Sequence, residues 1–328
     1  MINFDYVRPT TKKAAFDAAS KNTAAKFIAG GTNLTDLMKR GVENTEKIID
    51  INRLPLNKIT VENSVVRIGA LVLNSVLSED PLITQKFPLL SQALKAGASP
   101  QLRNMATLGG NMMQRTRCSY FYDTTMPCNK RMPGTGCAAI GGHNRMHAIF
   151  GASNSCIAVH PSDMCIALAA LDAEVILESN KGERRMAFLD FHRLPGNTPA
   201  IDNNLQKAEL ITGITLANNG LFSKHSAYVK LRDRSSYAFA LISVAAGLEL
   251  DGNTIKQVRL AMGGVAHKPW RLTTAEKYLV GKPITVNHFE AAAALAMKDA
   301  KSYGENNFKL KLAPAAIVEA LQKAASTS

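Results

Sequence analysis

A segment of about fifty residues between Asn111 and Pro161 shows neither the 3.6-residue period of a helix nor the alternation of a strand. Structureless stretches of this length are uncommon inside compact domains, and those that occur usually serve binding or catalysis. Four cysteines lie within this one, Cys118, Cys128, Cys137 and Cys156. The chain is therefore expected to fold around a long functional loop.

The rest of the chain has the composition of a globular protein. It has 328 residues, of which 46% are hydrophobic and 20% charged, enough for two or three domains with buried cores. Its longest apolar runs, such as Ala291–Met297 and Ile166–Leu171, are far shorter than the roughly 20 residues that span a bilayer. We therefore expect no membrane insertion. The N-terminal residues contain no apolar signal core and no twin arginine, so the chain shows no export signal of its own.

A formal net charge of +13 invites a nucleic-acid interpretation. The basic residues are scattered, however, and neither the Arg115–Arg131 region nor the run Lys230–Arg234 belongs to a nucleic-acid motif. We therefore expect no nucleic-acid binding. The charge is either a solvated surface or faces an anionic cofactor or an acidic partner subunit.

Periodicity and turn residues predict an α+β fold. Helices are expected at Lys12–Ala19 after the cap Thr10, 34–38, Leu89–Ala96, 162–171, from Ala238, Thr274–Leu279, Asn287–Ala300 and Ala313–Ala325. Strands are expected at Lys26–Ala29, Glu46–Ile51, Val65–Val72, Ala173–Glu178, Arg184–Phe188, Glu209–Leu216 and Ala227–Leu231. A hairpin turn is expected at Asp251-Gly252. The polar turn Asn218–Gly220 predicts a boundary between domains 1–218 and 219–328.

Two glycine pairs are candidates for phosphate binding. Each of the pairs Gly30-Gly31 and Gly109-Gly110 is predicted to end a strand that runs into a capped helix, where backbone N–H groups can bind an anion. Neither pair matches a P-loop or a G-x-G-x-x-G fingerprint. A lone Gly-Gly is usually only a tight turn. The two pairs together could hold the two phosphates of a dinucleotide.

The five cysteines contain no C-x-x-C pair, which argues against structural zinc. Disulfides remain an alternative, although an odd number leaves one thiol over. A [4Fe–4S] cluster needs four thiolates, and a long loop can supply them. Cys165 follows the cap Ser162-Asp163 on an apolar helix and reads as core. The predicted cluster ligands are Cys118, Cys128, Cys137 and Cys156, with His143 and His147 as substitutes.

Four motifs, in order along the chain, resemble a known family. They are Lys26–Met38, Ala106–Asn111, His160–Asp163 and Tyr228–Arg232. They resemble the FAD-binding subunits of the xanthine dehydrogenase and carbon monoxide dehydrogenase family of molybdenum hydroxylases, and most of all the flavoprotein subunits of bacterial periplasmic aldehyde oxidoreductases. The resemblance implies an FAD-binding domain of the p-cresol methylhydroxylase and vanillyl-alcohol oxidase type. It divides into subdomains of about 1–57 and 58–218, with an iron–sulfur loop at about 112–160. A C-terminal three-stranded sheet with a helical bundle would follow.

Matched position by position, the resemblance also assigns the cofactor contacts. The pyrophosphate cradle would consist of Lys26, Phe27, Ile28, Ala29, Gly30, Gly31, Thr32, Asn33, Leu34, Thr107, Leu108, Gly109, Gly110 and Asn111. Asp163 would bind ribityl or ribose hydroxyls, Lys230 would lie near the flavin ring, and Ile211 would contact it. From the residues alone, Lys230 could equally be an exposed strand lysine and Ile211 plain core. The same resemblance implies that the four loop cysteines hold a [4Fe–4S] cluster.

The function implied is that of an electron-transfer subunit, because the sequence offers no substrate-oxidising set of its own. A partner with a molybdenum cofactor would oxidise an aldehyde, a small [2Fe–2S] partner would relay electrons, and FAD here would pass them to an external acceptor. The complex would be a heterotrimer, periplasmic through co-export with a partner, or cytoplasmic. The alternative is a stand-alone FAD-dependent oxidase of the same fold.

Overall fold

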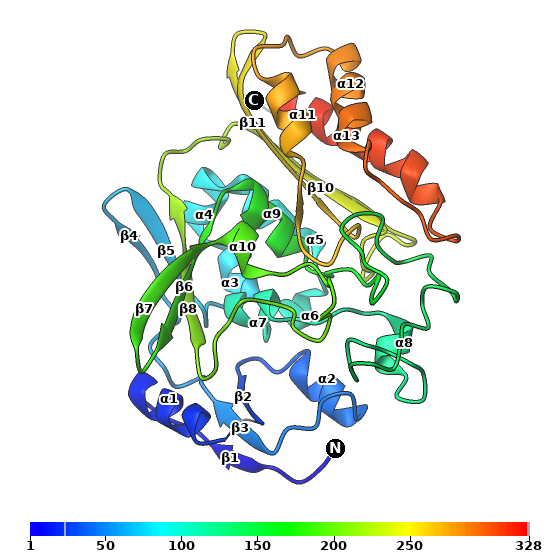
Figure 1. The fold of residues 1–328 in the computed structure, drawn as a ribbon. Coiled ribbons are helices and arrows are strands. Elements are labelled where there is room, and N and C mark those ends of the chain that lie inside the picture. Colours follow the sequence, from blue (N-terminus) through cyan, green and yellow to red (C-terminus); the bar gives the residue numbers. More distant parts are fainter. Residues whose placement is uncertain (23, 327–328) are drawn as a thin grey trace.

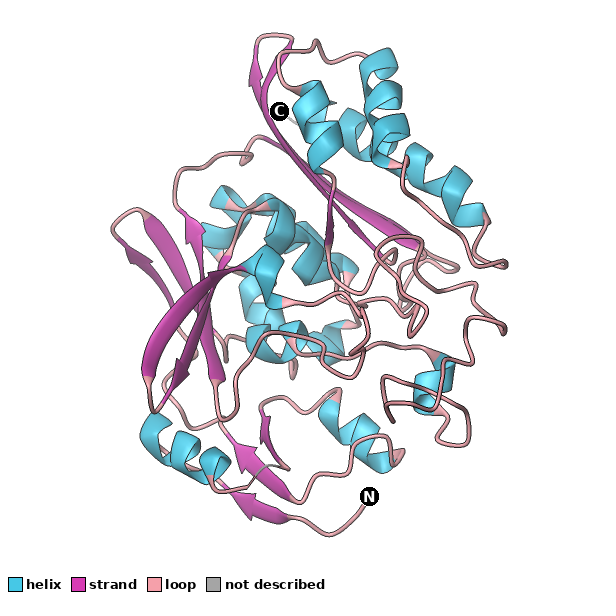
Figure 2. Cartoon of the chain, viewed as in Figure 1, coloured by secondary structure: helices cyan, strands magenta, loops and turns pink. Residues whose placement is uncertain are grey.

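The computed structural model describes residues 1–22 and 24–326. The chain forms two sheet-and-helix regions and a smaller N-terminal layer, with a long irregular loop between them (Figures 1 and 2). In the described residues, no helix combines the length and apolar character needed to cross a bilayer. The helical and strand content agrees with the predicted α+β class.

The N-terminal layer is a three-stranded parallel sheet in the order β1-β3-β2, at the bottom of Figure 1. Its elements are β1 (Asp5–Val7), α1 (Lys12–Ser20), β2 (Ala25–Ile28), α2 (Leu34–Lys39) and β3 (Lys47–Asp50). The cap of α1 is Thr11, whose Oγ1 accepts from the N–H of Ala14, and not Thr10 as predicted. The apolar residues of α1 pack on this sheet, which fixes the direction in which β2 runs into its glycine pair.

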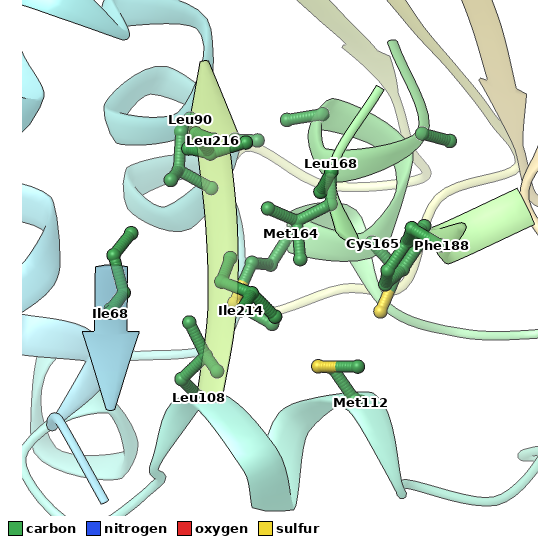
Figure 3. Packing of buried hydrophobic residues seen from close by; sticks show 14 of the residues in the cluster. Ile68, Leu90, Leu108, Met112, Met164, Cys165, Leu168, Phe188, Ile214 and Leu216 are labelled. Carbon is green, nitrogen blue, oxygen red and sulfur yellow. The ribbon is translucent and has the colours of Figure 1, made fainter. Parts of the chain in front are cut away.

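The central region is a five-stranded antiparallel sheet in the order β4-β5-β8-β6-β7. Its strands are β4 (Ile59–Glu62), β5 (Val65–Gly69), β6 (Glu174–Ser179), β7 (Gly182–Ala187) and β8 (Leu210–Ala217). The helices of this region are α3 (Asn74–Glu79), α4 (Pro81–Lys86), α5 (Pro88–Ala96), α6 (Pro100–Arg103), α7 (Leu108–Met112), α9 (Asp163–Ala170) and α10 (Phe188–Phe191). Figure 3 shows Ile68 of β5 and Ile214 of β8 facing Leu90, Leu108 and Leu168 of three helices, which together form the largest core.

The C-terminal region is an antiparallel sheet in the order β12-β11-β10-β9, covered by a helical bundle. Three strands are long, and the fourth, β12, has only two residues. The elements are β9 (His225–Leu231), β10 (Ile242–Asp251), β11 (Thr254–Gly263), β12 (Trp270–Arg271), α11 (Thr273–Leu279), α12 (Val286–Ala296) and α13 (Phe308–Ser326).

The helix predicted from Ala238 is wrong, because this segment forms strand β10. Residues 242–248 are all buried, since α13 covers one face of the strand while α5 and α9 approach it from the central region. A strand covered on both faces loses the alternation that distinguishes it from a helix. The hairpin at Asp251-Gly252 is confirmed.

The cysteine-rich segment contains a single short helix, α8 (Ser119–Tyr122), among the described elements. The rest of the loop turns back on itself and lies between the N-terminal layer and the C-terminal sheet (Figure 1). Cys128 faces Cys137 in an isolated bridge, and Ser153 faces Cys156 in another. Both bridges are local, and the first places Cys128 opposite Cys137.

Candidate functional site: two cavities and a cysteine cluster

The first glycine pair connects β2 to α2 and lies against the backbone of a distant segment. Gly31 has a φ of +69°, a conformation that strains residues with a Cβ. A Cβ at Gly30 would lie 1.7 Å from the carbonyl oxygen of Met105. Close backbone approach therefore requires glycine at position 30, and it brings the turn directly against the chain that leads into α7.

The second glycine pair is not the strand-to-helix turn that we expected. Gly109 and Gly110 lie inside α7, whose N-cap Thr107 accepts a hydrogen bond at Oγ1 from the N–H of Gly110 (3.2 Å). A Cβ at Gly109 would lie 3.1 Å from the Cβ of Ala70. These glycines let the short helix pack closely on the chain after β5.

Both glycine segments nevertheless line one cavity of about 160 Å³. The predicted cofactor residues in its wall are Lys26, Phe27, Ile28, Ala29, Gly30, Gly31, Thr32, Asn33, Leu34, Thr107 and Gly110. Leu108 and Gly109 are buried beside it, and Asn111 accepts a hydrogen bond at Oδ1 from Ser162 Oγ (2.5 Å). The structure thus brings together the two segments that the sequence separates by more than seventy positions.

A second, larger cavity of about 330 Å³ lies between the cysteine loop, the start of α9, and the strands β10 and β11. Asp163 lies in its wall and is held by two side chains of β9. The Tyr228 hydroxyl donates to Asp163 Oδ1 (2.7 Å), and Lys230 Nζ contacts Oδ2 (2.8 Å). Burial, followed by the charge of Asp163, raises the pKa of Tyr228 well above its ordinary value. The carboxylate is therefore fixed in place with its charge compensated.

Lys230 does not lie on the surface, and Ile211 does not lie in a cavity wall. The Lys230 side chain is only 5% exposed, so it is not an exposed strand lysine. Ile211 is buried in the main core, on β8, and does not line either cavity. Its contact with a flavin stays a prediction.

Some wall residues of the second cavity were not predicted as site residues. Phe239 lies on the loop between β9 and β10, and the Arg117 guanidinium lies 5.1 Å from its ring centre. Arg117 belongs to the basic 115–131 region and was not predicted as a site residue. No sequence signal marks Phe239, because only the return of the β9–β10 loop over α9 places it there.

The four cysteines predicted as ligands converge in the loop, while Cys165 lies in the main core. Burial first, and then the charges of Cys128 and Cys137, raise the pKa of the Cys118 thiol to about 11. The thiol of Cys156 hydrogen-bonds to Cys137, which lowers the pKa of Cys137 and raises that of Cys156. Each of the four thiols is thus near at least one other.

The four loop thiols match a cluster in the number and kind of their donors. Four thiolates from one loop are the ligands that a [4Fe–4S] cluster needs. In the described part of the chain, the three ligand atoms that lie within 4.8 Å of one another belong to a different group, His160, Cys165 and His192. Cys137 and Cys156 are hydrogen-bonded neighbours. The cluster itself stays a prediction.

The His160, Cys165 and His192 group lies in the core beside α7, and the sequence did not predict it. His192 Nε2 is 2.9 Å from the carbonyl oxygen of Met112, and His160 Nδ1 accepts from the N–H of Ser162 (3.3 Å). Burial lowers the pKa of both histidines, so both rings are neutral. We interpret the group as polar side chains that join α7 and α9.

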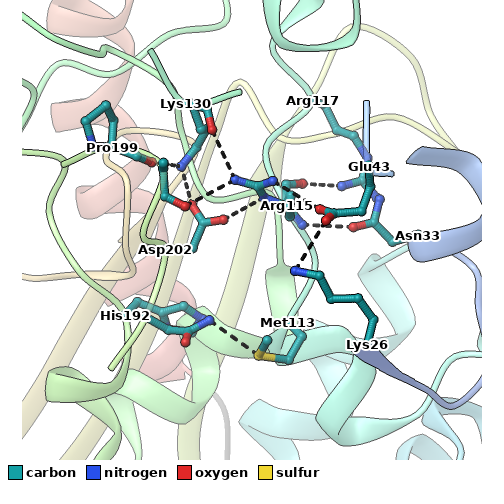
Figure 4. A network of polar contacts seen from close by, with 12 residues as sticks. Lys26, Asn33, Glu43, Met113, Arg115, Arg117, Lys130, His192, Pro199 and Asp202 are labelled. Carbon is teal, nitrogen blue, oxygen red and sulfur yellow. Dashed lines mark hydrogen bonds and ion pairs between the residues drawn. The ribbon is translucent and has the colours of Figure 1, made fainter. Parts of the chain in front are cut away.

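A network of charges connects the first glycine turn to the cysteine loop (Figure 4). Arg115 Nε is 2.7 Å from Asp202 Oδ2, and the backbone N–H of Arg115 donates to Asn33 Oδ1 (2.9 Å). Glu43 lies between Arg115 (3.5 Å) and Lys26 (3.3 Å). Asp123 is the one acidic residue of the loop itself. The acids that compensate Arg115 come from distant segments.

Lys130 occupies the buried end of this network. Its side chain is 2% exposed, it pairs with Asp202, and Nζ also donates to the carbonyl oxygen of Pro199 (3.0 Å). Burial alone would raise the pKa of Asp202, but the charges of Lys130 and Arg115 outweigh it and hold that pKa well below its usual range. Asp202 therefore stabilises the loop at neutral pH. This stabilisation is lost as the pH falls below about 4, the ordinary carboxyl value.

Asp202→Asn is expected to lower the free energy of unfolding by about 3–5 kcal/mol, because Lys130 would stay buried without its carboxylate. Urea unfolding at pH 7 measures this loss. Asp233→Asn is the matched control, since Asp233 pairs with Arg145 at the surface and an exposed pair contributes about 0–1 kcal/mol. Equal losses in the two variants would refute the role given to Asp202.

The two glycine segments and the cavity that they share suit a protein that binds a dinucleotide. Comparison with known proteins specifies the class. The family described as "FAD binding domain in molybdopterin dehydrogenase" matches residues 2–217, and the "CO dehydrogenase flavoprotein C-terminal domain" matches residues 226–324. The chain therefore belongs to the FAD-binding subunits of the molybdenum hydroxylase family, and it is an oxidoreductase subunit.

Individual relatives agree with this family. The chain is 47% identical to the aldehyde oxidoreductase FAD-binding subunit PaoB of Escherichia coli over 99% of both chains. It is 31% identical to the glyceraldehyde dehydrogenase medium chain of Sulfolobus acidocaldarius, over 86% of this chain and 82% of the relative. The solved carbon monoxide dehydrogenase of Hydrogenophaga pseudoflava superposes with a TM-score of 0.78 at 26% identity, over all of both chains.

Proposed function

We propose that this chain is the electron-transferring FAD and iron–sulfur subunit of a molybdenum-dependent aldehyde oxidoreductase. Its partners would be a small [2Fe–2S] subunit and a large subunit with the molybdenum cofactor, in a heterotrimer. The 47% identity to an aldehyde oxidoreductase FAD-binding subunit supports the substrate class. The complex would be periplasmic, through export of this chain together with a partner, or cytoplasmic.

One observation carries the electron-transfer part of the proposal. Cys118, a predicted cluster ligand, lines the same 330 Å³ cavity as Asp163, a predicted FAD contact. A cluster bound by this thiolate would lie beside the flavin. When bound, FAD exchanges electrons singly or in pairs and a cluster carries them one at a time, which suits this chain to a relay.

One FAD molecule would extend through both cavities. The backbone at 29–33 and at Thr107 and Gly110 would hold the pyrophosphate in the smaller cavity, next to Lys26 and Arg115. The segment Met113–Arg117 runs from the wall of one cavity to the wall of the other. Asp163, fixed by Tyr228 and Lys230, would accept hydrogen bonds from hydroxyls of the cofactor in the larger one.

The test compares the isolated chain with the chain coexpressed with its partners. Acid denaturation of the isolated chain should release yellow FAD into the supernatant, because the glycine segments contain no His or Cys that could attach it covalently. The isolated chain should not reduce a dye with aldehydes, whereas the complex should. Colour in the pellet would contradict the cradle, and would indicate attachment at a His or Cys of the larger cavity. Aldehyde oxidation by the isolated chain would support a stand-alone FAD-dependent oxidase instead.

A further inference from the structure

A histidine of the loop contacts one of the predicted cluster ligands. His147 Nε2 lies 3.1 Å from Cys118 Sγ, within hydrogen-bond distance of a sulfur. His147 is only 4% exposed, and both residues line the 330 Å³ cavity that also contains Asp163. The contact therefore lies in the wall between the predicted cluster and the predicted flavin site.

The position of the His147 backbone is fixed from the C-terminal region. Its carbonyl oxygen accepts hydrogen bonds from Lys309 Nζ (2.9 Å) and Asn306 Nδ2 (3.3 Å). Its N–H donates to the carbonyl oxygen of Asn144 (2.9 Å). Lys309 is itself fully buried on α13 and also holds the carbonyl oxygen of Gly264 (2.6 Å). The ring is thus held against the sulfur by helix α13 and the residues just before it.

The ring chemistry assigns the direction of the hydrogen bond once Cys118 binds iron. The Cys118 sulfur is then a thiolate without a proton, so the proton between the two atoms must be on Nε2. Nδ1 is buried and has no hydrogen-bond partner among the described residues. The sulfur is therefore the ring's one polar partner in the described part of the chain.

We propose that His147 is not a cluster ligand but donates its Nε2–H to the Cys118 thiolate, on the side of the cluster that faces the flavin site. This hydrogen bond raises the reduction potential of the cluster. The inference rests on the proposed cluster. The reduced cluster carries one more negative charge, part of it on its sulfurs, so an N–H donor stabilises the reduced form more than the oxidised form. His147 acts on electron transfer through Cys118 and is a positioning residue.

The test is a redox titration of the full chain, purified anaerobically and followed by the electron paramagnetic resonance of the reduced cluster. His147→Phe fills the ring volume without an N–H, and it should lower the potential by about 59 mV, equivalent to a tenfold change in a one-electron equilibrium. His147→Gln retains a donor and should recover at least half of that shift. Iron, sulfide and FAD per chain should match the wild type in both variants. His147→Leu replaces the phenylalanine variant if that chain does not fold.

His288→Leu is the control. His288 lies on α12, where its Nδ1 is 3.1 Å from the Tyr278 hydroxyl, away from the cavity walls, so its loss should leave the potential unchanged. An unchanged potential in His147→Phe with full iron would refute the hydrogen bond and leave the cluster standing. Loss of iron in both His147 variants would make His147 a ligand and also refute the inference. Wild type without iron would refute the cluster itself.

Discussion

Serine at Cys118, Cys128, Cys137 or Cys156 is expected to reduce bound iron and sulfide from about four each per chain to a small fraction of that value. These four thiols are spread over 39 positions of sequence, and the structure brings them together. Each thiolate would bind at one corner of the cluster. Iron and sulfide assays on anaerobically purified protein measure the effect. Because the loop adjoins α7, the variants are also expected to bind FAD more weakly.

Cys165 provides the control for this series. It is completely buried in the main core, away from the loop thiols, so Cys165→Ser and Cys165→Ala should keep the full iron of the wild type. The serine hydroxyl would not lack polar neighbours. The ring nitrogens of His160 and His192 lie within 4.8 Å of the sulfur, so its cost should fall at the lower end of about 1–3 kcal/mol. Iron lost with Cys165→Ser but retained with Cys156→Ser would show that the ligand set is wrong.

Zero iron in the wild type would refute the cluster. The metal assay would then distinguish a disulfide loop from a zinc site. A disulfide loop would contain no iron in any variant. A zinc site would give one zinc per chain and no sulfide. The lack of a C-x-x-C pair argues against zinc, and the metal assay tests that argument directly.

Gly30→Ala is expected to reduce FAD occupancy at least tenfold. The added Cβ would lie 1.7 Å from Met105 O and 2.6 Å from Met105 C, so the two backbones that form the smaller cavity would have to separate. A tenfold loss needs only about 1.4 kcal/mol, far less than such an overlap of backbone atoms costs. The flavin released per chain measures the effect, and circular dichroism checks that the variant is folded.

Gly141→Ala is the control for this substitution. No atom lies within 4 Å of a Cβ built at Gly141, and its φ is not in the left-handed region, so alanine should be tolerated with full FAD and iron. Should Gly30→Ala unfold the chain, Gly31→Ala is the milder variant. There the strain comes from a φ of +69° and a contact of 3.3 Å with the flexible Ile28 side chain. Full FAD in a folded Gly30→Ala protein would show that this turn is not the cradle.

Features that depend on neighbours along the chain could be predicted from the amino-acid sequence. The glycine turn after β2, the cap Ser162 before α9 and the hairpin at Asp251-Gly252 were all predicted from local residues. So was the exclusion of Cys165 from the loop thiols. Local backbone preferences act over a few neighbouring residues, so they can be predicted from the sequence. The ordered motifs likewise predicted the family, which the comparisons confirm.

Contacts between residues far apart in the chain could not be predicted in this way. Strand β10 has no alternation because helices cover both of its faces, so its sequence was mistaken for a helix. Asp202 neutralises Lys130 from 72 positions away, and this carboxylate could not be assigned to the loop from sequence order. The contact between His147 and Cys118 spans 29 positions of irregular loop, where no period predicts which side chains face each other. Such pairings depend on how whole elements pack, and burial, charge compensation and shape determine them together.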